Sequence, residues 1–319
     1  MYLNDEEERY GNRFRTYANY INNLAEVLDR YDYDLNNYLN KIISTKQYKK
    51  ITGGRILDER KLCKSMRNAW FTEIQINSYK EYEDFIQISA QWIPVQVYYS
   101  LFIAIRSYFN SIGSEINKDH KSTLNAISQE IKKRPDIFPI PWKIILEEDP
   151  NKTDITLTNI NASYSKISKI SPLSYNVLNK DSIGLFLKTT RKREIEKRKD
   201  EWKKQNKKKK TPKAVSERII EKMSPTTIFD FLYRMRISSN YSDVDSFIVF
   251  NNNSEEINKF YNSFLKINWY GLAMLEILII KSYGKKQFIK MAEDFTNKIS
   301  NVLTKQLIDK RLEYYRKII

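Results

Sequence analysis

The sequence predicts an all-α protein, a helical bundle that carries one large, partly irregular and basic insertion. The 319 residues contain only 7 Gly and 8 Pro, which leaves few tight turns and few strand breakers. Apolar residues make up 41% of the chain, enough for a sizeable core, and many recur at helical spacing. No unit of about 20 to 50 residues repeats, which argues against a solenoid.

The first third of the chain is predicted to be helical in four segments. Apolar spacing predicts one or two helices between residues 5 and 48, and an amphipathic helix over residues 57–70. Ser78 is expected to cap a third segment. The clearest helix runs from Pro94 to Ile112, with Pro in the first turn and apolar residues at steps of three and four. Gly113 is expected to end it.

The middle of the chain changes character. Lys118 or Asp119 is expected to start a helix that stops before the next proline. Three prolines then exclude regular helix and predict an ordered loop that packs Phe138 and Trp142. Residues 151–174 are rich in Ser, Thr and Asn with β-branched residues between them, which favours a short hairpin or irregular structure.

The last third returns to helix. A basic helix is predicted from residue 181 or 182 to 202, followed by a Lys-rich run that ends at Pro212. Ser224 is expected to cap the next helix, with Pro225 at its first position. Acidic residues in the first turn predict a long helix over 254–282, and a last helix is expected over 285–318.

Positive charge is concentrated in one segment. Residues 188–213 hold 14 Lys or Arg against 4 Asp or Glu, so this segment carries +10 of the chain's net charge of +16. Localised charge of this kind suits a surface that meets phosphates or an acidic partner. The alternative is a solvated basic helix in a chain rich in Lys and Asn. The residues expected to contact nucleic acid are Arg191, Arg193, Lys203, Lys204, Lys207, Lys208, Lys209 and Lys210.

Several kinds of site are excluded or disfavoured. The one cysteine, Cys63, cannot form an intramolecular disulfide and has no ligands near it in sequence, so neither a structural zinc site nor a cofactor is expected. The one histidine, His120, excludes serine-protease-like triads and multi-histidine metal sites, although carboxylate-only metal sites stay open. The sequence has no Walker-type loop and no glycine-rich dinucleotide turn.

The expected location is the cytoplasm. The first twenty residues include an acidic run, Asp5 to Glu8, and lack the apolar core of a secretory signal. With no apolar stretch near twenty residues, no membrane-spanning helix is expected. The basic segment has too poor an apolar face to favour binding to a membrane surface.

His120 is the first candidate for chemistry. It lies at or near a predicted helix start, where a purely structural role competes with a role as general base or acid on a ribose hydroxyl. Proximity to Arg106 would favour the catalytic role.

A second candidate is the segment from Arg234 to Tyr241, which includes Arg236 and Asn240. Arginine at a helix end can hold a phosphate in two-pronged fashion, and Asn and Tyr can donate hydrogen bonds to the same group. The alternative is an ordinary helix terminus in which arginine pairs with a nearby aspartate, Asp243 or Asp245, and Asn240 is the cap.

Two stretches of the chain resemble HEPN domains. Residues Tyr98 to Arg106, then Gly113 and the pair His120-Lys121, look like the central helix pair of that family, in which an aromatic-rich helix precedes a helix start with His and Lys. Residues 232–243 are similar to its closing helix, where an arginine is followed at short distance by polar and tyrosine residues. Together the two stretches cover about a ninth of the chain.

The resemblance implies a helical bundle, often dimeric, of toxin–antitoxin and antiviral defence systems, in which many members are metal-independent ribonucleases. Active members carry Arg and, four to six residues later, His, and the 2′-hydroxyl attacks its own phosphodiester. Here the arginine position is Arg236, but Asn240 and Tyr241 stand where histidine is expected, which leaves cleavage open. His120 lies in a different predicted helix and is not expected simply to replace it.

On this alignment the bundle is divided by an insertion. Residues 1–150 form its N-terminal part, residues 151–223 form the insertion with the basic helix and the Lys-rich arm, and residues 224–319 form its C-terminal part.

Three hypotheses follow. The first is a defence or toxin protein that binds and cleaves RNA with Arg236, Asn240 and Tyr241, and with His120 as a further candidate. The second is a non-catalytic RNA- or DNA-binding module that uses the basic arm. The third is a subunit whose arm docks an acidic protein. RNA is favoured over DNA, and a homodimer is among the expected assemblies.

Overall fold

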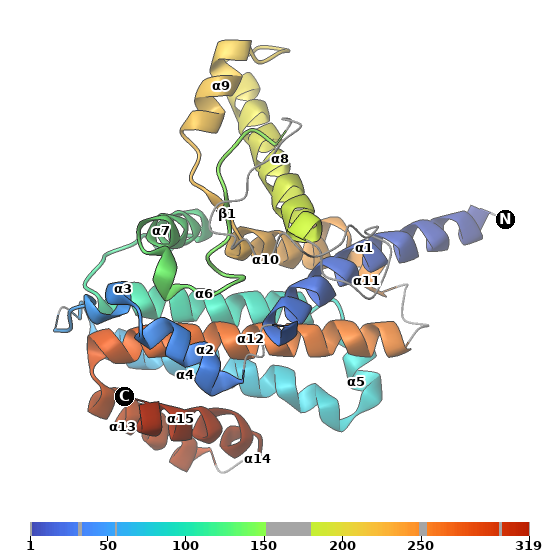
Figure 1. Ribbon diagram of the computed structural model, residues 1–319. Coiled ribbons are helices and arrows are strands. Elements are labelled where there is room, and N and C mark those ends of the chain that lie inside the picture. Colours follow the sequence, from blue (N-terminus) through green and yellow to red (C-terminus); the bar gives the residue numbers. More distant parts are fainter. Residues whose placement is uncertain are drawn as a thin grey trace.

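The protein is almost entirely helical, as the computed structural model shows (Figure 1). The structure describes residues 2–30, 34–54, 56–150, 180–248, 254–299 and 302–318. The prediction of an all-α fold is confirmed. The N-terminal half contains α1 (Tyr2–Arg30), α2 (Leu35–Ile43), α3 (Lys46–Lys49), α4 (Glu59–Ser78), η1 (Tyr79–Glu81), α5 (Glu83–Ile88), α6 (Ile93–Ser111), α7 (His120–Lys133) and η2 (Pro135–Ile137).

The C-terminal half continues this pattern. Its elements are α8 (Lys180–Gln205), α9 (Lys213–Glu221), α10 (Ile228–Ile237), the π-helical η4 (Ser238–Ser242), α11 (Val244–Ile248), α12 (Ser254–Tyr283), α13 (Lys285–Lys298), α14 (Val302–Thr304), the π-helical η5 (Lys305–Asp309) and α15 (Lys310–Ile318). In the described residues the only strands are β1 (Ile145–Leu146) and β2 (Thr226–Thr227), an antiparallel pair with Ile145 opposite Thr227.

The core lies between three long helices, α4, α6 and α12, which run side by side through the bundle (Figure 1). Helix α1 packs on α12, and α10 packs on α6. The helices α6 and α12 approach closely at Gly271. A Cβ atom there would lie 2.7 Å from Leu101 Cδ2 and 3.1 Å from the Trp142 ring, so any larger residue would require the Leu101 side chain to shift.

Helix α12 is the most apolar element. Within the described residues it is the one helix long and apolar enough to cross a membrane by length and composition, and 83% of the window concerned is buried inside the protein. The expectation that the chain has no apolar stretch near twenty residues is therefore too strict. The burial explains the composition, because a helix surrounded on all sides by the core is apolar all round.

Local sequence signals position α6 and α7 as predicted. Gly113, with a φ of 73°, follows α6. Asp119 caps α7, since its carboxylate accepts a hydrogen bond of 2.8 Å from the backbone N–H of Ser122. The proline-rich loop after α7 buries Phe138 and Trp142 completely, which confirms the prediction of an ordered, packed connection.

Three predicted helix boundaries are wrong. Ser78 is the last residue of α4 and caps no helix with its side chain. Thr227, not Ser224, caps α10, because Thr227 and Asp230 form a reciprocal capping box while Thr226 and Thr227 still belong to β2. The expected single C-terminal helix is broken after Lys298 into shorter pieces that fold back on the bundle.

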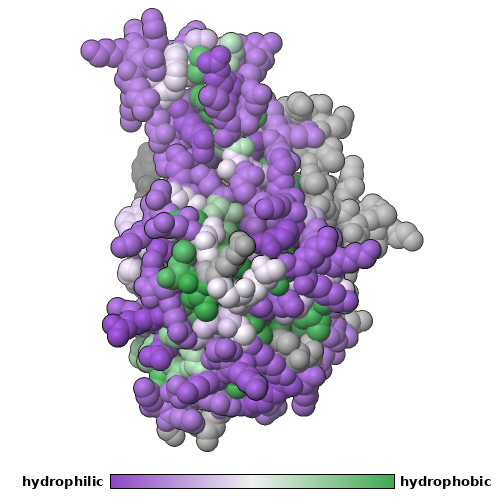
Figure 2. Space-filling view, turned by 90° about the vertical axis from the view of Figure 1, so that its left-hand side faces the viewer, coloured by the Kyte–Doolittle hydropathy of each residue, from purple (hydrophilic) through white to green (hydrophobic). Residues whose placement is uncertain are grey.

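Helices α8 and α9 form an arm that projects from the bundle (Figure 1). The arm is anchored at its base, where Phe186 and Leu187 are fully buried in the same core as the rest of the bundle. Its outer part is mostly hydrophilic (Figure 2). Helix α9 was not predicted, and the expected hairpin over residues 151–174 lies outside the described residues.

Candidate functional site

An aromatic and basic cluster joins the two stretches that resemble HEPN domains. Helix α6 contributes Tyr98, Tyr99 and Phe102, α7 contributes His120 at its first position, and α10 contributes Arg236. Because α7 and α10 both pack on α6, residues more than a hundred positions apart in sequence meet here. We call this set, together with Tyr233 and Tyr241, the His120–Arg236 cluster.

The imidazole of His120 is held by aromatic rings. The Tyr98 hydroxyl lies 2.8 Å from its Nδ1, and the ring stacks on Tyr233 at 5.3 Å and tilts against Phe102 at 4.6 Å. Burial raises the pKa of Tyr98, which therefore stays a neutral phenol. A neutral phenol can donate to Nδ1 or accept from Nδ1–H, and in the tautomer with Nδ1–H the other ring nitrogen, Nε2, is the proton acceptor.

His120 is kept neutral by its surroundings. Burial lowers the pKa of His120, and the positive charges of Arg236 and Arg106 lower it further, while Asp119 opposes them. A neutral imidazole near neutral pH has a nitrogen able to accept a proton. The proximity of Arg106 that would favour a catalytic role is present, since Arg106 and His120 both contact the Phe102 ring.

Arg236 lies between two tyrosines. Its guanidinium carbon is 5.4 Å from the ring centroids of both Tyr99 and Tyr241, and Nη2 donates a hydrogen bond of 3.0 Å to the Tyr99 hydroxyl. Among the described residues no carboxylate pairs with it, and its buried Nε has no partner. Asp243, one expected partner, is bonded to Arg13 instead.

The structure brings His120 and Arg236 together although they lie on different helices. Both contact the Tyr99 ring, with the His120 centroid 5.7 Å from that of Tyr99. Tyr241 joins them with 64% of its surface exposed, so the cluster reaches solvent. Asn240 lies half-buried on η4, and no contact of its side chain with Arg236 or His120 is found among the described residues. The sequence did not predict the roles of Tyr99 and Tyr233 in this cluster.

The basic residues of α8 divide into two groups. Arg191 was expected to contact nucleic acid, but it is 1% exposed and structural: its guanidinium donates to the backbone carbonyls of Glu147, Glu148 and Ser224. This anchors α8 to both strand segments. The prediction for Arg191 is therefore wrong, because its position on the buried face of α8 was not visible in the charge pattern.

The remaining basic residues are accessible or half-buried. Arg193 is exposed at the base of the arm, and Lys203 pairs with Asp200 at 2.5 Å. Beyond them the tip of the arm carries five exposed lysines, which are Lys204, Lys207, Lys208, Lys209 and Lys210. These side chains face water without a carboxylate partner among the described residues, as a phosphate-contacting surface requires.

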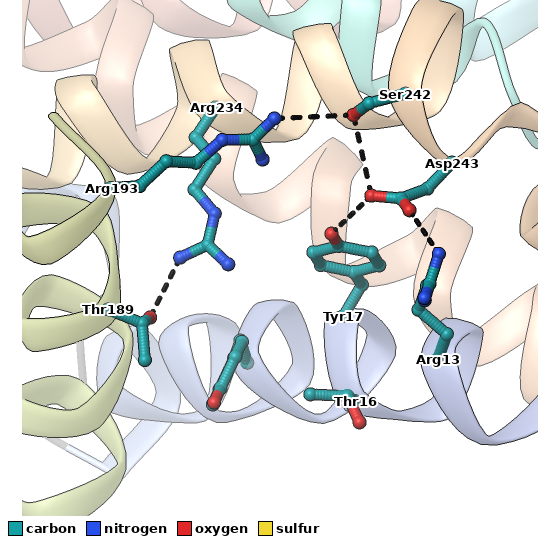
Figure 3. Close-up of a pocket in the computed structure, with 9 residues that line it drawn as sticks. Arg13, Thr16, Tyr17, Thr189, Arg193, Arg234, Ser242 and Asp243 are labelled. Atoms are coloured by element: carbon teal, nitrogen blue, oxygen red, sulfur yellow. Dashed lines mark hydrogen bonds and ion pairs between the residues drawn. The ribbon is translucent and has the colours of Figure 1, made fainter. Parts of the chain in front are cut away.

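A polar cavity lies beside α10 at Arg234 (Figure 3). Its volume is about 470 Å³, and α1, α8, α10 and η4 line it. Three arginines, Arg13, Arg193 and Arg234, reach into it from different elements. Arg193 and Arg234 belong to two separate candidate segments of the sequence. Arg13 was not predicted, since no local pattern relates α1 to α10.

Metal-ligating side chains do not cluster in the described part of the chain. Within the described residues, no group of three or more His, Cys, Asp or Glu side chains is arranged to hold a metal ion.

Neither family models, nor curated proteins, nor solved structures give a match to this chain. The chemistry of the site itself is therefore the basis for a function.

Proposed function

We propose that the protein is a HEPN-like, RNA-associated protein of a defence or toxin–antitoxin system, and that the His120–Arg236 cluster cleaves RNA without a metal. The observation that carries the proposal is a guanidinium without a carboxylate partner among the described residues, held beside a neutral histidine. An unpaired guanidinium offers a phosphate two parallel donors, and a neutral imidazole accepts a proton.

In this mechanism Arg236 holds the non-bridging oxygens of the scissile phosphate. His120 takes the proton of the adjacent 2′-hydroxyl, the 2′-oxygen forms a bond to phosphorus, and the bond from phosphorus to the 5′-oxygen breaks. The leaving 5′-oxygen takes a proton from solvent. The products are a 2′,3′-cyclic phosphate and a 5′-hydroxyl end. Tyr241, exposed beside Arg236, offers a ring on which a neighbouring base stacks.

The test is cleavage of end-labelled single-stranded RNA in EDTA by the wild type and by Arg236→Ala and His120→Ala. Each variant should lose about a hundredfold or more in rate, the range that one general base or one oxyanion donor contributes. Arg316→Ala is the control, since Arg316 forms an exposed ion pair with Glu293 on another part of the bundle. RNA with 2′-O-methyl groups should bind without being cut. Cleavage that survives in both variants, or that requires a divalent metal, contradicts the mechanism.

A second candidate function is binding without cleavage through the arm. The five exposed lysines at the tip of the arm favour it, because each phosphate contact releases about one counterion. Replacing Lys207 to Lys210 by Gln should flatten the dependence of RNA affinity on salt. If RNA and DNA both fail to bind while deletion of the arm abolishes capture of an acidic protein, docking of such a partner replaces this function.

A further inference from the structure

The cavity of Figure 3 is distinct from the His120–Arg236 cluster. Arg234 and Arg236 are two residues apart on α10, so they leave the helix on nearly opposite sides. Arg234 lines the cavity, whereas Arg236 contacts Tyr99 in the cluster. The cavity thus has its own walls and shares none of the side chains of the His120–Arg236 cluster.

The one carboxylate in the wall is already neutralised. Asp243 Oδ1 accepts a hydrogen bond of 2.5 Å from Arg13 Nη1, and Oδ2 accepts one of 2.8 Å from the Tyr17 hydroxyl (Figure 3). The Ser242 hydroxyl also approaches Oδ2, at 3.4 Å. The negative charge of Asp243 is therefore paired with Arg13 and does not neutralise the other two arginines.

Arg193 and Arg234 meet only hydroxyl groups in the described part of the protein. Arg234 Nη1 donates to Thr189 Oγ1 at 2.7 Å and to Thr190 Oγ1 at 3.3 Å, and its Nε is buried with no partner. Arg193 reaches the hydroxyls of Ser238 and Ser242 at 3.5 Å, which are weak contacts. The Thr189 hydroxyl donates its own hydrogen bond to the Phe186 carbonyl and accepts one from Arg234, so it orients Arg234 without neutralising its charge.

By contrast, two other buried or partly buried arginines of the bundle are paired with carboxylates. Arg311 pairs with Glu73 and Glu276, and Arg134 pairs with Glu130. With three arginines and one aspartate, the cavity has a net charge of +2. Two guanidinium groups without carboxylates in a shared polar cavity offer charged donors to an anion, and the planar guanidinium matches the oxygens of phosphate.

We propose that this cavity binds a phosphomonoester, with its dianionic phosphate held between Arg193 and Arg234. A phosphomonoester carries close to two negative charges near neutral pH, which matches the net positive charge of the cavity. A volume of about 470 Å³ lies in the range of small-molecule sites and exceeds what a phosphate alone fills. The organic part then lies against the ring edges of Tyr17 and Tyr20, which line the same cavity. A 5′-mononucleotide, or the 5′-phosphate end of an RNA strand, has this chemistry.

The experiment is isothermal titration of the full chain with inorganic phosphate, a 5′-mononucleotide and the matching nucleoside. The mononucleotide should bind, and the nucleoside should bind at least tenfold more weakly. Arg193→Gln and Arg234→Gln should each weaken binding of the mononucleotide about tenfold or more, the effect of losing one hydrogen-bonded charge. Arg316→Gln, which removes an exposed arginine elsewhere, should leave it unchanged.

Two short RNA strands, one with and one without a 5′-phosphate, separate the two sources of the ligand. A preference of tenfold or more for the phosphorylated strand that is lost in Arg193→Gln assigns the cavity to strand ends, and equal binding of both strands assigns it to free mononucleotides. Arg193 is exposed, so its variant should fold even if Arg234→Gln does not, which circular dichroism checks. The proposal is overturned if no phosphomonoester binds, if the nucleoside binds equally well, or if binding is unchanged in folded Arg193→Gln. None of these results depends on whether the protein cleaves RNA.

Discussion

The C-terminal helix α15 is held to the bundle by a buried arginine, and Arg311→Met should destabilise the protein strongly. Arg311 is 1% exposed and donates four hydrogen bonds of 2.7 to 2.9 Å, two to Glu73 on α4 and two to Glu276 on α12. Tyr315 and Trp70 donate two more bonds to Glu276. Methionine fills much of the same volume but leaves two buried carboxylates facing each other without a cation.

The expected loss in the free energy of unfolding is about 3 to 5 kcal/mol, the range for breaking a buried ion pair by removing one partner. Urea denaturation at pH 7 measures it. Arg316→Met is the matched control on the same helix: its ion pair with Glu293 is 46% and 45% exposed and should contribute no more than about 1 kcal/mol. A loss in Arg311→Met within about 1 kcal/mol of the control would refute this account of the buried pair.

The same variant should respond to pH in a defined direction. Burial is the main cause that raises the pKa of Glu73, and Arg311 is the main influence that lowers it again. Without Arg311 that pKa rises further above the unfolded value, so the native state takes up protons first as the pH falls. The loss in the free energy of unfolding caused by Arg311→Met should therefore become smaller as the pH falls from 7 to 5. A loss in the free energy of unfolding that stays constant or grows over this interval would contradict the effect of Arg311 on the pKa of Glu73.

Three further predictions concern the bundle and its candidate site. Thr227→Ala removes the capping box with Asp230 and should lower the free energy of unfolding by about 1 kcal/mol, while Thr227→Ser should restore most of it in thermal unfolding. Gly271→Ala places a Cβ atom 2.7 Å from Leu101 and should lower the free energy of unfolding by about 1 to 3 kcal/mol, despite alanine's higher helix propensity. Urea denaturation measures this loss, and equal stability would show that the packing of α6 and α12 can adjust there. Because the pKa of His120 is lowered, RNA cleavage should persist through pH 6.5 and fall only below it. A pH–rate profile measures the cleavage, and NMR titration of this single histidine measures its protonation. A loss of rate that begins above pH 7 would contradict the role of His120 as base.

The helical fold could be predicted from the sequence, because helices are specified by interactions between residues a few positions apart. The apolar spacing from Pro94 to Ile112 and the cap at Asp119 predicted α6 and α7 to within a residue or two. The sequence also located the excess of positive charge on one segment, since charge is a property of composition. Where a stronger local signal competed with a weaker one, as Thr227 did with Ser224, the prediction was displaced by a few residues.

Which side chains meet could not be predicted from the sequence and became clear from the tertiary structure. It placed His120 beside Arg236, although the separate helices suggested otherwise. It buried Arg191, which belongs to the most basic segment of the chain, and exposed its neighbour Arg193 at a cavity. Helical periodicity states that a residue lies on one face of its helix but not which element covers that face. That depends on the packing of α1, α6, α8 and α10 against one another, which is set by contacts between residues far apart in sequence.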